Sequence, residues 1–419
     1  MFSSLLPIST RHALFFCLFL SMFELLTYVA SDVVMPGMLT VIKDLNAQPY
    51  YVPWSLNAYL LGGVGFQWII GPASDRFGRR PFLLIGCALF SISCLATPWV
   101  HNIQLFTLLR FIQGIGLGFV VVVSYPALQE AFSESDAIRL IALFANIALL
   151  SPLFGPLVGS VLLSYLSWRT LFIAIALLAA LAWFGLLRWM PETIGVVRQD
   201  GSKIDCQPLE VKTLARAYGD LLKNQRCLSG SVALGLTGLP LMAWIALSPL
   251  LLVHNLQMSM LEYALWQLPI FGALIAGNIV LNFTAVKFKA EQLLYFSLFP
   301  VFIGITLALV LTLMCENIIA LIIGMAIYAF GLGICNATLY RLTLFSSEHG
   351  KGSVSAMIGM ISVAIFSLGG ALMAGLGAGN SLDAYIIAAI IPMLAALFIM
   401  INLFTRQKRK ETQITASSH

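Results

Sequence analysis

Long apolar stretches separated by short polar connections run through almost the whole chain. A helix that crosses a bilayer needs about 20 mostly apolar residues, and we count twelve stretches near that length. The pattern predicts an all-α membrane protein with twelve transmembrane helices, the first of them retained in the mature protein because no cleavage pattern follows it. The expected spans are 12–38, 51–72, 81–100, 104–130, 138–165, 168–190, 228–253, 261–284, 292–314, 318–345, 352–377 and 383–404.

One polar stretch, residues 191–226, interrupts the apolar pattern. Its mixed charges and its amphipathic run at 209–222 predict a cytoplasmic linker that lies along the membrane surface. The linker divides the chain into an N-terminal six-helix bundle (1–190) and a C-terminal six-helix bundle (227–404), which a basic cytoplasmic tail (405–419) follows. Arg76 and Phe77 recur as Lys287 and Phe288, 211 positions later, so we expect two pseudo-symmetric halves with a substrate site between them.

The composition supports a membrane setting and fixes an orientation. Hydrophobic residues make up 60% of the chain and charged residues 10%, against about 25% charged residues in soluble domains. Basic residues gather in the even-numbered connections and the tail, which predicts that both termini are cytoplasmic. The net charge of +5 then reflects topology and anionic headgroups rather than nucleic acid. The basic positions on that side are Arg76, Arg79, Arg80, Arg139, Arg198, Lys203, Lys212, Arg216, Lys223, Lys287, Lys289, Lys351, Arg406, Lys408, Arg409 and Lys410.

Catalytic and cofactor patterns are missing from the sequence. It has no phosphate-binding loop, no Ser/His/Asp arrangement and no soluble domain to hold either. The seven cysteines lack metal-ligand spacing and suit apolar packing. We therefore expect neither an enzyme nor ATP-driven transport, and neither a metal nor another cofactor, with the proton gradient as the energy source.

Two acids, Glu24 and Asp32, lie inside the first apolar stretch. An acid at the centre of a membrane helix costs roughly 2.5 to 3.5 kcal/mol on the insertion scale, so such groups usually serve a cavity, a partner or a proton. Helical geometry places the two about 80° apart around the axis and about 12 Å apart along it, with Tyr28 midway. The stretch therefore predicts an acidic, aromatic stripe that takes part in proton or cation chemistry.

The second half carries no matching charges. The positions 211 residues after Glu24 and Asp32 are Gly235 and Ala243. We expect proton chemistry in the N-terminal half, with an apolar wall from the C-terminal half. The candidate pocket-lining residues are Tyr28, Ser31, Gln113, Leu117, Leu239, Met242 and Ala243.

Arg110 lies inside the fourth predicted span, at a depth similar to that of Asp32. A direct or water-mediated contact between them would let proton release respond to conformation. Snorkelling of Arg110 to the outer interface is the alternative. Arg110, Gly114, Leu117 and Val121 share a helix face, which we expect to line the cavity.

Three motifs carry a family resemblance. Residues 71–81 (GPASDRFGRRP) resemble the signature loop between spans 2 and 3 of the major facilitator superfamily, Arg110–Gly114 matches its R-x-x-Q-G pattern, and residues 152–159 contain the G-P-x-x-G element of its antiporter branch. Over essentially the whole chain the sequence is similar to the MdfA-type multidrug/proton antiporters. The resemblance implies that Glu24 and Asp32 handle protons and cationic drugs.

The resemblance also implies a cytoplasmic gate, formed by Gly71, Asp75, Arg76, Gly78, Arg79, Arg80 and Glu130. A purely topogenic role of the arginines is the alternative. The antiporter motif comprises Pro152, Gly155, Pro156 and Gly159. Here the glycines suit close helix packing, and the prolines suit a kink that seals the pore.

We thus expect a monomeric, multi-pass transporter of the bacterial inner membrane that exports lipophilic cationic or neutral small molecules in exchange for protons, by alternating access. Its partners would be the substrate, protons and the lipid bilayer. Export of a dedicated metabolite such as a siderophore or sugar, import by proton symport, and a non-transporting receptor or scaffold are the alternatives. The apolar wall has no polar pattern that would identify one substrate.

Overall fold

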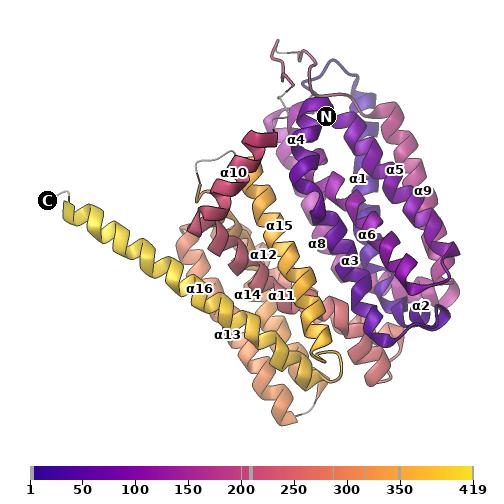
Figure 1. Ribbon diagram of the computed structural model, residues 1–419, viewed down its shortest axis with the longest axis vertical. Coiled ribbons are helices and arrows are strands. Elements are labelled where there is room, and N and C mark those ends of the chain that lie inside the picture. The colour runs from indigo at the N-terminus through magenta and orange to yellow at the C-terminus, as the bar shows by residue number, and fades with distance from the viewer. Residues whose placement is uncertain are drawn as a thin grey trace. The chain divides into compact units, whose positions relative to one another are not determined.

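A computed structural model describes residues 4–199, 201–206, 211–285, 287–315, 317–347 and 351–417. Within these ranges every regular element is a helix, and the only extended pairings are two isolated bridges, Ser4 with Phe132 and Val197 with Lys203. The chain forms two compact units, Met1–Glu210 with Leu252–Gln267, and Val211–Leu251 with Leu268–His419. The expected all-α fold is confirmed (Figure 1).

Apart from the segment Leu252–Gln267, the helices of the first unit begin near the N-terminus and end before the linker. In chain order they are α1 (Thr10–Asp32), η1 (Met35–Gly37), α2 (Met38–Asp44), η2 (Pro49–Tyr51), α3 (Val52–Gly65), α4 (Gln67–Phe77), α5 (Arg79–Ala96), η3 (Thr97–Trp99), α6 (Ile103–Phe119), the π-helix η4 (Val120–Ser124), α7 (Tyr125–Ala131), α8 (Glu134–Tyr165) and α9 (Trp168–Trp189). Figure 1 shows them as the indigo-to-magenta bundle.

The remaining helices belong mainly to the second unit. They are α10 (Val211–Lys223), α11 (Gln225–Ser248), the π-helix η5 (Pro249–Asn255), α12 (Met260–Thr284), α13 (Ala290–Cys315), α14 (Ile318–Leu344), α15 (Lys351–Gly375) and α16 (Leu382–Ser417). Helices α13 and α14 pack along one another, and α11 packs against α14, α15 and α16. Helix α16 continues past the expected end of the last span.

Ten helices in the described ranges are long and apolar enough to cross a membrane. The other two expected spans are also helical. The span expected at 51–72 is divided into α3 and α4 at Phe66, where Gly62, Gly63 and Gly65 weaken the helix. The span expected at 138–165 lies within α8, which contributes the shorter apolar helix Leu150–Tyr165.

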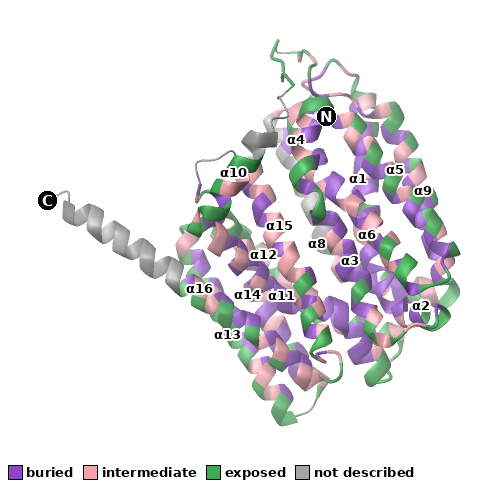
Figure 2. Cartoon of the chain, in the orientation of Figure 1, coloured by how far each residue is buried: buried purple, intermediate pink, exposed green. Residues whose placement is uncertain are grey.

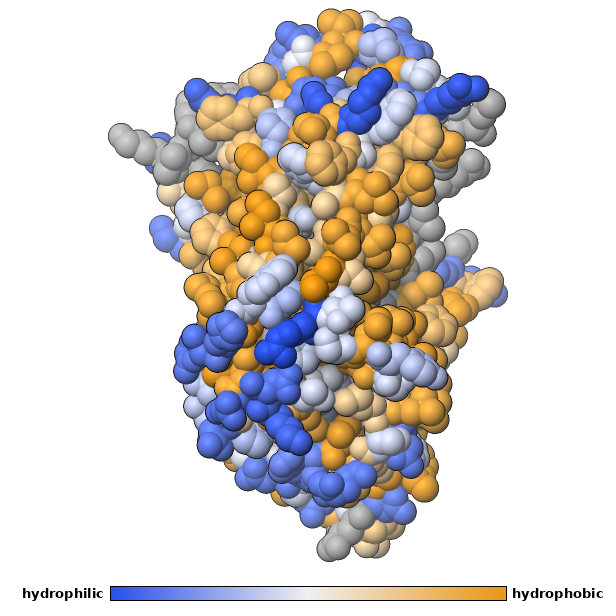
Figure 3. Space-filling view, turned by 90° about the vertical axis from the view of Figure 1, so that its right-hand side faces the viewer, coloured by the Kyte–Doolittle hydropathy of each residue, from blue (hydrophilic) through white to orange (hydrophobic). Residues whose placement is uncertain are grey.

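Polar groups face inward and large apolar groups face outward, as a lipid environment requires. On α1, Leu14 and Leu18 are each 55% exposed, whereas Glu24 is fully buried. Figure 2 shows that buried and exposed positions alternate along the helices of the first unit, and Figure 3 shows a hydrophobic band between hydrophilic side chains above and below it. In water such exposed apolar area would favour aggregation. The chain is a multi-pass membrane protein.

Glycines bring α3 and α6 into backbone contact. A Cβ atom on Gly114 would lie 1.9 Å from the carbonyl oxygen of Tyr59, and one on Gly118 would lie 2.6 Å from that of Gly63. Membrane helices use small residues in this way to approach closely. The face of Arg110, Gly114, Leu117 and Val121 was expected to line a cavity, but at Gly114 it forms this helix contact instead.

The linker contains the expected amphipathic helix. Helix α10 packs against α11 and α15, with Leu221 buried and Arg216 and Lys223 exposed. Asn224 caps the following helix by accepting from the backbone N–H groups of Arg226 and Cys227. The polar outer face and apolar inner face of α10 agree with the amphipathic run predicted at 209–222. Its placement on the membrane surface stays a prediction.

Candidate functional site

Glu24 lies at the middle of α1, completely buried inside the first unit. Its Oε1 accepts a hydrogen bond of 3.2 Å from the hydroxyl of Tyr125, the first residue of α7. Its Oε2 is buried without a hydrogen-bond partner among the described residues. No basic side chain in those ranges forms an ion pair with Glu24. An acid so placed has one free acceptor position for a proton or a cation.

Asp32 ends α1 and is 7% exposed. Its Oδ2 accepts a 2.6 Å hydrogen bond from the hydroxyl of Ser151 on α8, and Ser31 directly precedes it in the chain. Ser31 itself is buried. Hydroxyl partners of this kind suit either state of the carboxyl group, because a hydroxyl both donates and accepts. The site of Asp32 therefore tolerates a change of protonation.

Arg110 is fully buried in α6 and does not reach solvent, so the snorkelling alternative is wrong. Its Nε donates to Ser55 (3.1 Å), and its Nη1 donates to the carbonyl oxygen of Ala30 (3.0 Å) and to Oε1 of Gln113 (2.8 Å). The guanidinium lies 4.7 Å from the ring centroid of Tyr59. These contacts join α6 to α1 and α3.

Asp32 and Arg110 do not form a direct ion pair within 4.0 Å among the described residues. Arg110 instead binds the backbone of Ala30, two residues before Asp32. Its Nη2 is buried without a hydrogen-bond partner in the same ranges. The expected direct contact is thus not present in this conformation, although the arginine and the acid are held on the same stretch of α1.

The glycines of the antiporter motif pack against the acid-bearing helix. A Cβ atom on Gly155 would lie 2.5 Å from Cβ of Asp32, and one on Gly159 would lie 2.2 Å from the carbonyl oxygen of Val33. Helix α8 continues through Pro152 and Pro156 without ending. The packing interpretation of the glycines is confirmed, and a pore-sealing role stays a prediction.

Replacing Gly159 with alanine is therefore expected to lower stability by about 1–3 kcal/mol, the usual range for overpacking. The backbone of Val33 offers no flexible side chain that would move aside. Gly272 on α12 provides a matched control, because a Cβ atom there meets nothing within 4 Å. Thermal unfolding in detergent measures both variants. Equal melting temperatures for G159A and G272A would contradict the close packing of α8 on α1.

A second cluster forms where α4 and α7 end and α5 begins. Arg79 is 7% exposed and forms ion pairs with Asp75 and with Glu130, the latter at 2.8 Å. Its Nη1 donates to Ser74 (2.7 Å). Burial raises the pKa of the Asp75 carboxyl, and the nearby Arg79 guanidinium opposes this effect. Three of the expected gate residues are thus brought together.

The other expected gate residues make separate contacts. Arg76 lies over the ring of Phe77 at 5.4 Å, and Arg80 donates to the carbonyl oxygen of Leu187 (2.7 Å). Gly78 has φ 106°, a conformation that glycine adopts easily. A side chain on Gly71 would meet only Val122, at 3.2 Å.

Glu192 completes this cluster, although sequence reasoning assigned it no role. Its Oε1 accepts from the backbone N–H groups of Arg79 (2.9 Å) and Ile194 (3.1 Å), and its Oε2 accepts from that of Arg80 (3.2 Å). An acid at a helix N-terminus satisfies backbone donors and the helix dipole. Thr193 donates to Glu130 (2.5 Å). The start of the linker therefore holds the start of α5 and the end of α7.

The candidate wall residues of α11 belong to the second unit. Leu239 is buried and packs on Gly369 of α15, Ala243 is fully buried, and Met242 is half-buried. In the first unit, Gln113 is fully buried and donates to Thr97 (2.8 Å), whereas Tyr28 and Leu117 are half-buried. Their role as a drug-binding wall stays a prediction.

Among the described residues no group of three or more His, Cys, Asp or Glu side chains is placed to hold a metal ion. The acids instead contact hydroxyl groups of Tyr125 and Ser151. Sequence reasoning missed both. Ser151 directly precedes the antiporter motif. Tyr125 lies between the β-branched run at 120–123, from which Ser124 separates it, and Pro126, and both of these flanking features disfavour a regular α-helix.

Comparison with known proteins agrees with this arrangement. The family profile described as Major Facilitator Superfamily matches residues 14–374. The multidrug transporter MdfA of Yersinia pestis (strain Angola) is 45% identical over 360 residues, which cover 86% of each chain. The MdfA of Shigella boydii serotype 4 is 46% identical over the same coverage.

Solved structures share the fold at low sequence identity. A D-xylose-proton symporter superposes with a TM-score of 0.72 at 15% identity, covering 93% of this chain and 97% of the symporter. A bacterial homologue of the human lysosomal transporter Spinster, inward-facing and unoccupied, gives a TM-score of 0.67 at 14% identity, covering 94% and 96%. On the profile match and the MdfA relatives, the chain belongs to the Major Facilitator Superfamily and is a membrane transporter rather than an enzyme.

Proposed function

We propose that the chain exports lipophilic cationic or neutral small molecules in exchange for protons, by alternating access in the bacterial inner membrane. The observation that carries the proposal is the pair of buried carboxyl groups on α1, each bound by hydroxyls and neither by a basic side chain of the described residues. Buried acids without such a partner commonly bind a proton or a cation in membrane proteins. The MdfA relatives, named multidrug transporters, support the substrate class.

Competition between proton and substrate follows from this geometry. A proton from the outer side neutralises a carboxyl group, and its release towards the cytoplasm frees a negative charge that attracts a lipophilic cation. Neutral substrates would bind the apolar wall without the charge. No cofactor takes part, because the proton gradient supplies the energy.

The cluster of Asp75, Arg79 and Glu130 is proposed to close the cytoplasmic side during this cycle. It is supported by the near-complete burial of Arg79 and by its two acid partners on different helices. Glu192 and Thr193 tie the linker to the same cluster. We propose further that both termini are cytoplasmic and that one chain transports on its own.

Proton coupling is tested with purified protein. Adding the monovalent lipophilic cation tetraphenylphosphonium to detergent-solubilised protein in weak buffer is expected to release protons, which a pH-sensitive dye measures. In proteoliposomes, uptake of the same cation should require an imposed pH gradient. Cation binding with no proton release at any pH between about 5 and 9 would contradict antiport, because both carboxyl groups would then keep one charge state.

A further inference from the structure

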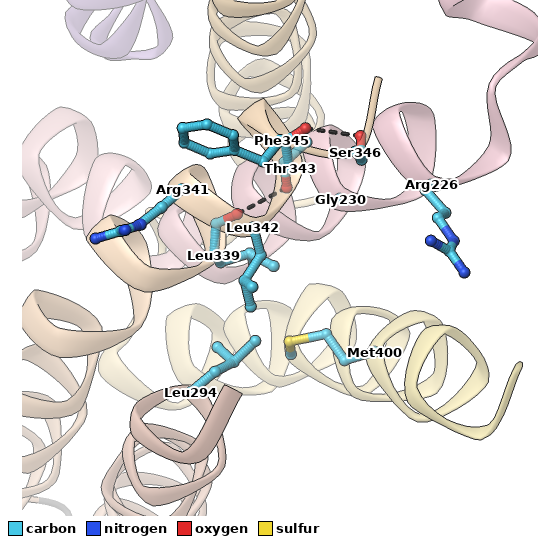
Figure 4. A pocket seen from close by; sticks show the side chains of 10 residues that line it. All are labelled: Arg226, Gly230, Leu294, Leu339, Arg341, Leu342, Thr343, Phe345, Ser346 and Met400. Atoms are coloured by element: carbon cyan, nitrogen blue, oxygen red, sulfur yellow. Dashed lines mark hydrogen bonds between the residues drawn. The ribbon is translucent and has the colours of Figure 1, made fainter. Parts of the chain in front are cut away.

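A cavity of about 340 Å³ lies within the second unit, where α11 and α13 begin and α14 ends. Its lining also includes Met400 of α16 (Figure 4). Since these are helix ends of membrane-spanning segments, the cavity lies near the level of the membrane surface. Its volume is at the lower end of the range of ligand pockets, about 300–1,000 Å³.

The cavity has an apolar floor and a basic rim. Leu294, Leu339 and Met400 are each 3% exposed or less. Arg226 and Arg341 are exposed, and Figure 4 shows them on opposite sides of the leucine and methionine side chains. This combination suits a ligand with an acidic head and an apolar body.

The hydroxyl groups that line the cavity already donate hydrogen bonds within the protein, so the two arginines remain as the donors for a ligand. Thr343 donates to the carbonyl oxygen of Leu339 (2.7 Å), and Ser346 donates to that of Thr343 (2.7 Å). Neither Arg226 nor Arg341 forms an ion pair within the described part of the chain. Glu291, one turn before Leu294 on α13, is not among the lining residues.

We propose that this cavity binds an anionic phospholipid of the surrounding membrane. The phosphate group pairs with one of the two guanidinium groups, Arg226 or Arg341, the other attracts the same negative charge from the opposite side, and an acyl chain covers Leu294 and Met400 between them. Guanidinium groups bind phosphate oxygens in bidentate geometry, and basic pockets between helices at the membrane surface take acidic lipid headgroups. Phe345, 64% exposed at the same rim, adds an aromatic group of the kind that anchors proteins at the interface.

The test is native mass spectrometry of the full chain, titrated with phosphatidylglycerol, phosphatidylcholine or glycerol 3-phosphate. Phosphatidylglycerol is expected to bind at least about tenfold more tightly than the other two, because only it offers both the net negative charge and the acyl chains. Arg226→Gln and Arg341→Gln should each weaken its binding about fivefold, and Arg226→Lys should restore part of the loss. Equal binding of glycerol 3-phosphate would assign the site to free phosphates and overturn the proposal.

Lys287→Gln with Lys289→Gln is the matched control, since both lysines are exposed near the start of α13 and neither lines the cavity. The control should keep wild-type affinity for phosphatidylglycerol. Thermal unfolding in lipid-free detergent should give the same melting temperature for the glutamine variants and the wild type. A loss in the control as large as in the arginine variants, or no loss in either, would show that the cavity does not select the lipid.

Discussion

Replacing Arg110 with lysine is expected to abolish transport and to destabilise the first unit by about 3 kcal/mol or more, the range for breaking a buried charged network. The guanidinium donates to Ser55, to the carbonyl oxygen of Ala30 and to Gln113 at the same time. A lysine ammonium is a point charge on a flexible stem and does not reproduce this planar fork. Melting temperature and counterflow in proteoliposomes measure the two effects.

Arg169 gives the matched control. Like Arg110 it lies over an aromatic ring, 4.2 Å from the ring centroid of Trp168, but its charged partner is Asp44 at 2.8 Å and about a third of its side chain is exposed. Exposed ion pairs contribute about 0–1 kcal/mol, so Arg169→Lys should have little effect on melting temperature. If Arg110→Lys kept both wild-type transport and a wild-type melting temperature, the buried network would have no role beyond packing.

The helical pattern was predictable because each span carries its own signal in apolar length. The ends of the divided span, expected at 51–72, were not predictable from the sequence. They depend on how Gly62 and Gly114 let α3 and α6 approach each other. The acids of α1 were visible in the sequence as rare charges in an apolar stretch. Their partners Tyr125 and Ser151 were not, because tertiary packing brings α7 and α8 to α1.

The tertiary partners of Arg110 and of the gate residues were likewise not predictable from the sequence. Equal depth in the membrane predicted that Arg110 lies near Asp32, and Arg110 indeed reaches the backbone of Ala30. Depth alone does not say which way a guanidinium turns. Arg79 was predicted by its motif, whereas the capping role of Glu192 depends on a fold-back of more than 100 residues.

Replacing Asp32 with asparagine is expected to abolish proton coupling, so that a pH gradient no longer drives export of either cationic or neutral substrates. Asp32 is bound by Ser151 and lies two residues from the carbonyl group that Arg110 holds. A movement of α6 or α8 therefore changes the surroundings of this acid directly. Asparagine keeps the shape but neither binds nor releases the proton, and pH-driven transport in proteoliposomes measures the loss.

Glu24→Gln should give a different result. The free Oε2 of Glu24 lies about 12 Å along the helix from Asp32, too far for one acid to replace the other. Glutamine removes the charge that attracts cations, so export of lipophilic cations should fall at least about tenfold while export of neutral substrates continues, since a lost charge discriminates only between charged and uncharged ligands. Asp205→Asn, in the exposed linker, controls for an unspecific effect of neutralising an acid. Equal loss of both substrate classes in both α1 variants, at wild-type melting temperatures, would mean that Glu24 and Asp32 serve one shared proton step.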